Sequence, residues 1–160
     1  MESWSSEIHN TIDSKLESSR DKDILFFRIN EFKRNISRVD EFSASCPACK
    51  KEMINISEVV QKIDEAVNTP GKTRREYDRL ISRLSKHMQK EHGFYAPYYH
   101  SYVYALYGVI GGFILGFILY SILPQYQLEM FVIGISVGLI LSYILGSTKD
   151  KKVRSEKKLM

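Results

Sequence analysis

The sequence predicts an all-α protein with a small helical domain followed by a C-terminal membrane hairpin. Two observations lead to this fold class. Residues 102–123 contain no charged side chain, and residues 128–146 contain only Glu129, so both stretches are apolar enough to cross a bilayer. Before them, apolar residues recur every three or four positions, which is the spacing of helices with one buried face.

The two apolar stretches are long enough to span a membrane as helices. At ~1.5 Å per residue, 102–123 covers roughly 33 Å, enough for a hydrocarbon core of ~30 Å. Only residues 124–127 lie between the stretches, which allows no more than a tight reversal. Lipid offers no partners for backbone polar groups, so two adjacent helices are expected. The alternative is a buried hairpin of a soluble protein, but a chain of 160 residues is short to cover two such helices on all sides.

The distribution of charge predicts the orientation of the hairpin. The tail at 149–160 has six basic and two acidic residues, and so by itself matches the net charge of +4 of the whole chain. By the positive-inside rule, we expect a multi-pass membrane protein with both termini cytoplasmic and the 124–127 turn outside. The chain begins with an acidic, Ser-rich stretch that has no signal peptide, so the first span is expected to act as an internal signal.

Small residues form a stripe along each predicted span. They recur at every fourth position and permit close approach of helix backbones, which drives helix association in lipid. Either the two helices of one hairpin pack on each other, or a stripe serves subunit contacts and builds an oligomer or pore. Neither span has a buried charge or a polar row that could line a hydrated channel. The stripe residues are Gly108, Gly112, Gly116, Gly134, Gly138 and Ser142.

The first long helix is expected at 21–42. Its apolar residues alternate steps of three and four, the spacing of a single buried seam. The seam packs either on the protein's own domain or on a second copy of the chain. Its members are Leu25, Ile29, Phe32, Ile36 and Val39.

Cys46 and Cys49 form a Cys-x2-Cys turn with a proline inside it and two lysines directly after it. In such a turn, backbone N–H groups point at the sulfurs, and the lysines favour the thiolate form that binds metal. The rival interpretation is a thioredoxin-like redox site, which expects a strand and a βαβ unit around the pair. No such pattern surrounds it.

Two further helices follow the cysteines, at 57–67 and from Thr73 to about His92. Thr73 and Glu76 match a capping box at the start of the second helix. His87 lies on its apolar face, and His92 precedes Gly93, where a helix commonly stops. An ideal helix separates these histidines by roughly 140°. We therefore expect the last turn to loosen if both bind one ion.

The combination of Cys46-x2-Cys49 with Leu84-x2-His87-x4-His92 resembles the knuckle and helix end of Cys2His2 zinc fingers. The resemblance implies a structural Zn²⁺ held by Cys46, Cys49, His87 and His92. The separation of Cys49 and His87 departs from the pattern, because it is about three times that of a compact finger and contains a whole extra helix. With four protein ligands, such a site has no open position for a substrate. Two unpaired thiols and two surface histidines are the alternative.

A run of basic residues also covers the predicted helix at 73–92. Fingers read DNA from such a helix, whereas anionic lipid headgroups attract basic residues close to a membrane. Residues 1–101 are nearly neutral overall, so a solvated or lipid-facing helix is favoured over nucleic-acid binding.

These patterns divide the chain into four parts: an N-terminal helical region at 1–43, a zinc-binding helical domain at 44–96, the hairpin at 97–148 and the basic cytoplasmic tail at 149–160. No nucleophile–base pair, carboxylate dyad or open metal site indicates an enzyme. We expect a membrane-anchored adaptor or regulator that recruits a macromolecular partner. The alternatives are an oligomeric membrane-perturbing effector and a membrane-tethered nucleic-acid binder.

Overall fold

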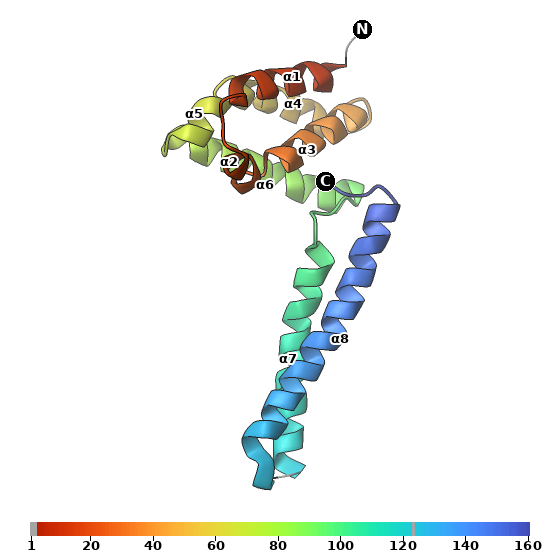
Figure 1. Ribbon diagram of the computed structural model, residues 1–160. Coiled ribbons are helices and arrows are strands. Elements are labelled where there is room, and N and C mark those ends of the chain that lie inside the picture. The colour runs from red at the N-terminus through yellow and green to blue at the C-terminus, as the bar shows by residue number, and fades with distance from the viewer. Residues whose placement is uncertain (1–2, 123) are drawn as a thin grey trace. The chain divides into compact units, whose positions relative to one another are not determined.

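The computed structural model describes residues 3–122 and 124–160, and its regular elements there are all helical (Figure 1). The predicted all-α class is confirmed. Residues 1, 2 and 123 lie outside the described part, and with them the predicted end of the first span at 123. The elements are α1 (Trp4–Leu16), α2 (Asp21–Phe26), α3 (Ile29–Phe42), α4 (Pro47–Val60), α5 (Ile63–Asn68), α6 (Lys72–His92), α7 (Tyr99–Ile122), the 3₁₀ turn η1 (Pro124–Tyr126) and α8 (Gln127–Ser155).

The chain forms two compact units. The first contains the residues up to Phe94 together with Met160, and the second is Tyr95–Leu159. The predicted regions 1–43 and 44–96 thus fall largely in a single unit with a common core.

The core of the first unit is built from one face of each of its longer helices. Phe32 and Ile36 of α3 are fully buried, as are Ile12 of α1, Ile56 of α4 and Tyr77 of α6. The ring of Tyr77 meets that of Phe32 edge-on, with centroids 5.3 Å apart. From Ile29 onwards, the apolar seam predicted at 21–42 therefore packs inside the protein's own domain.

The prediction of one continuous helix at 21–42 is wrong. The helix is broken at Arg28, which adopts a left-handed backbone conformation (φ 57°) between α2 and α3. The break turns Phe27 inward, where its ring lies under the guanidinium of Arg74 and its carbonyl accepts a hydrogen bond from the Tyr77 hydroxyl at 2.5 Å. Leu25 consequently leaves the seam and is 77% exposed.

Two other helix boundaries differ from the predictions. The helix expected at 57–67 begins earlier, at Pro47, and is interrupted between Val60 and Ile63. The expected capping box at Thr73 is also wrong: α6 starts at Lys72 with Gly71 in the N-cap position and no side-chain cap hydrogen bond. Instead, the Arg74 side chain donates to the carbonyls of Ala66 and Val67 and secures the turn that leads into α6.

The second unit is a pair of long helices, α7 and α8, which lie side by side and are joined through η1 (Figure 1). Both are long and apolar enough to cross a membrane. In each, only 11% of the most apolar window is buried in the structure, whereas the core helix of a soluble protein is mostly buried. Beyond the predicted span end at Gly146, α8 continues without interruption into the basic tail as far as Ser155.

Candidate functional site

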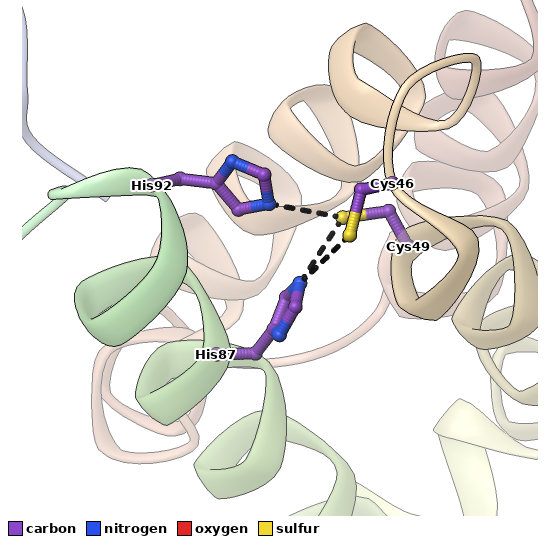
Figure 2. Close-up of side chains that lie close together, drawn as sticks. All are labelled: Cys46, Cys49, His87 and His92. Atoms are coloured by element: carbon purple, nitrogen blue, oxygen red, sulfur yellow. Dashed lines mark hydrogen bonds between the residues drawn. The ribbon is translucent and has the colours of Figure 1, made fainter.

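The four predicted metal ligands come together in the first unit (Figure 2). Their ligand atoms all lie within 4.8 Å of one another. Cys46 occupies the N-cap position of α4 and Cys49 lies in its first turn, while His87 and His92 lie in the last turns of α6. Figure 2 shows both imidazoles pointing from α6 toward the two sulfurs.

The distances agree with a shared tetrahedral ion. The His87 Nε2 atom lies 3.5 Å from the Cys46 sulfur and 3.3 Å from the Cys49 sulfur, and the His92 Nε2 atom lies 3.4 Å from the Cys49 sulfur. Zinc bonds of ~2.3 Å to sulfur and ~2.05 Å to nitrogen, at the tetrahedral angle, put the two ligand atoms about 3.6 Å apart. The residues therefore fit a zinc ion.

Helix α6 keeps its α-helical form through His92. The expected loosening of the last turn is therefore not observed, and the imidazoles converge by side-chain reach, with ring centroids 5.1 Å apart. The Phe42 ring stacks on His92 at 4.1 Å and 21° and fixes its plane. Gly93 follows in the left-handed conformation that ends the helix (φ 69°).

The local structure of the cysteine turn explains the different character of the two thiols. The backbone N–H groups of Cys49 and Ala48 point at the Cys46 sulfur and lower the pKa of that thiol. Burial raises the pKa of Cys49 to about 12. Burial lowers the pKa of His92, and the charge of the neighbouring His87 lowers it further. Both effects favour the neutral imidazole that binds metal. A divalent cation supplies the charge that stabilises a buried thiolate.

No protein-family model matches this chain, and searches of curated proteins and of solved structures return no match. The interpretation of the site therefore rests on its own geometry.

The six stripe residues lie in the contact between α7 and α8. A Cβ atom built on Gly112 would come within 2.8 Å of the Ile135 backbone, and one on Gly138 within 2.4 Å of the Gly108 carbonyl oxygen. Gly116 and Gly134 meet in the same way, and Ser142 packs against Gly108. Both stripes are thus used inside one hairpin.

One polar contact of the hairpin was not predicted. The carboxylate of Asp150 on α8 accepts hydrogen bonds from the backbone N–H groups of His100 and Ser101 and from the Ser101 hydroxyl, at 3.0, 2.9 and 2.6 Å. It satisfies the free N–H groups at the start of α7. The sequence carries no signal for this contact, because the two partners are far apart in the chain.

Proposed function

We propose that this chain is a membrane-anchored adaptor whose helical domain is held by a structural zinc ion and recruits a macromolecular partner to the cytoplasmic face. The convergence of Cys46, Cys49, His87 and His92 is the observation that carries the proposal. Zinc would supply a cross-link between the start of α4 and the end of α6. Four protein ligands fill a tetrahedral site, so the ion is assigned a structural role and no catalytic one.

The membrane anchor in this proposal is the α7–α8 hairpin. Its lipid-facing surface is apolar along its length: Phe117 is 64% exposed and Leu141 57% exposed. In water, such a surface would be costly, whereas in a bilayer it is matched by the lipid. The basic end of α8 supports an orientation with both chain ends on the cytoplasmic side.

The partner surface in this proposal is the apolar pair on α2. Leu25 and Phe26 are 77% and 76% exposed, although the other large apolar residues of α1 and α3 are mostly buried. The pair is held in place by the turn at Arg28 and by the edge-on contact of Phe26 with Phe27. An exposed aromatic side chain beside an exposed leucine suits an apolar pocket on a partner protein, because aromatic residues are enriched at protein interfaces.

The two alternative functions receive less support. The basic run on α6 is partly used within the domain, because Arg74 caps α5 and Arg83 pairs with Glu52. This reduces the charge available to nucleic acid. A pore or oligomer built on the glycine stripes would first have to open the hairpin that already uses them.

The metal is tested on the full chain purified from membranes without chelator. Elemental analysis should give about one zinc per chain. Cys49→Ser should lose the metal and most of the domain's thermal stability, because a small core depends on such a cross-link. Ser45→Ala, an exposed position beside the knuckle, is the matched control and should keep both. Absence of zinc from the wild type, or its retention in Cys49→Ser, would contradict the assignment.

The adaptor role is tested by a photoreactive phenylalanine at position 26, with exposed Glu58 on α4 as the control position. An adaptor should give a discrete cross-linked protein from position 26 that is missing from position 58. A product containing only a second copy of this chain would favour the oligomeric effector. Cross-links to lipid alone would show that α2 lies on the bilayer, and would reject the adaptor.

A further inference from the structure

A groove of about 480 Å³ lies in the second unit, between the start of α7 and the end of α8. Tyr102 and Ala105 line it from α7, and Tyr143, Lys151 and Arg154 line it from one face of α8. We call these five residues the basic groove. Its volume is within the range of small-molecule sites.

The basic groove contains two positive charges of the tail that have no acidic partner among the described residues. Within the described part of the chain, Lys151 and Arg154 are not paired with any acidic side chain. By contrast, Lys152 and Lys158 both pair with Glu156, at 3.8 and 3.0 Å. Lys151 and Arg154 lie three residues apart on α8, and so project to the same side.

Asp150 also lines the cavity but does not cancel these charges. Its two carboxylate oxygens accept three hydrogen bonds from His100 and Ser101 at the start of α7. The positive end of a helix dipole therefore compensates the charge of this carboxylate. The groove remains attractive to an anion.

Apart from Ser101 and Ser147, the remainder of the lining is apolar or aromatic. Tyr102 is 75% exposed and Tyr143 66% exposed, and the small side chain of Ala105 also lines this part of the groove. This part belongs to the apolar stretch of each helix, while Lys151 and Arg154 lie just beyond the last apolar turn of α8. The groove thus runs from a cationic end to an apolar end along the helix pair.

We propose that the basic groove binds one anionic glycerophospholipid. Its phosphate would lie against Lys151 and Arg154, and one acyl chain would follow Tyr102, Ala105 and Tyr143. The inference rests on the proposed membrane anchor, in which this end of the hairpin lies at the level of the headgroups. A soluble phosphate would leave the apolar part of the groove unfilled, so the lining favours a lipid.

The magnitude of the preference for an anionic lipid follows from the charges of Lys151 and Arg154. A basic side chain close to a membrane surface contributes about a fivefold preference for an anionic lipid, so two give roughly twenty-five-fold. We expect at least a tenfold enrichment of phosphatidylglycerol over phosphatidylcholine in the lipid that stays bound.

The experiment uses the full chain reconstituted in vesicles with equal amounts of these two lipids. The protein is then extracted in mild detergent, and the bound lipid is quantified by mass spectrometry. The double variant Lys151→Gln/Arg154→Gln should lose the enrichment. Lys152→Gln/Lys158→Gln removes the same charge outside the groove and should keep most of it. Ala105→Leu, which fills the apolar part, should reduce the total bound lipid with both cations in place.

The outcomes separate this inference from the proposed anchor. Equal binding of the two lipids by the wild type, or equal losses in the two double variants, would overturn the groove as a specific site. Helicity and zinc content measured on the same samples exclude unfolding as the cause of a loss. Release of the wild type from membranes by alkaline carbonate would reject the anchor and the lipid site together. Retention without lipid preference would reject the lipid site alone.

Discussion

The substitution Gly138→Ala tests how closely α7 and α8 approach. The added Cβ would lie 2.4 Å from the Gly108 carbonyl oxygen and 2.7 Å from the Gly112 Cα, both of them backbone atoms that cannot rotate away. Ordinary contact begins at 3.4 Å, so the helices must separate locally by about 1 Å. A gap of this size forfeits a quarter to a half of the dispersion energy of the atom pairs concerned.

We expect Gly138→Ala to destabilise the hairpin by about 2 kcal/mol, which is about thirtyfold in the unfolding equilibrium. Gly111→Ala is the matched control, because a Cβ at Gly111 meets nothing within 4 Å. Both variants gain the same helix propensity, so their difference isolates the clash.

The assay is unfolding by sodium dodecyl sulfate in mixed micelles. The separation of the helices is followed by energy transfer between dyes at the exposed positions Tyr102 and Thr148. If the two variants have equal stability, the close approach of the helices is refuted. If Gly138→Ala instead lowers the mass of an assembly while the hairpin keeps its stability, the stripe serves subunit contacts.

Two further predictions concern orientation and the core. Peptide tags at either chain end should be accessible only from the cytoplasmic side of sealed vesicles, and one inserted after Gln125 only from outside; opposite accessibility of the two ends would mean that one helix does not span. Tyr77→Phe should destabilise the helical domain by about 1 kcal/mol, because it leaves the buried Phe27 carbonyl without its hydrogen-bond donor. Chemical denaturation measures this loss. The control Tyr98→Phe, at a 60% exposed position, should not change the stability.

The ligand set could be predicted because each half has a local signature. Cys46 and Cys49 are close in sequence, and His87 lies on the face of α6 that its apolar spacing marks as buried. Hydrophobic spacing likewise indicated the helices and their buried faces. These signals come from residues within a few turns of one another, and such signals survive folding largely unchanged.

The rest depends on contacts between distant segments. Nothing in the sequence marks Arg28 as a residue with a left-handed backbone. The helix break at Arg28 is favourable because it lets Phe27 contact Tyr77 and Arg74. The basic groove requires α8 to continue past Gly146 beside the start of α7, and a charged tail does not itself predict a helix. Both features depend on contacts with residues that are distant in the sequence.

The order of the ligands along the chain connects the proposed metal to the proposed anchor. His92 is the last residue of α6, and the second unit begins shortly after it, at Tyr95. A bound ion would therefore fix the last helical turn of the domain at the point where the chain leaves for the membrane. Without it, the His92 ring would be held by stacking on Phe42 and by its contacts with Cys49 and His87, and the end of α6 would fray more readily while the hairpin kept its own glycine contacts. Metal loss is thus expected to loosen the domain at its tether without releasing the protein from the bilayer.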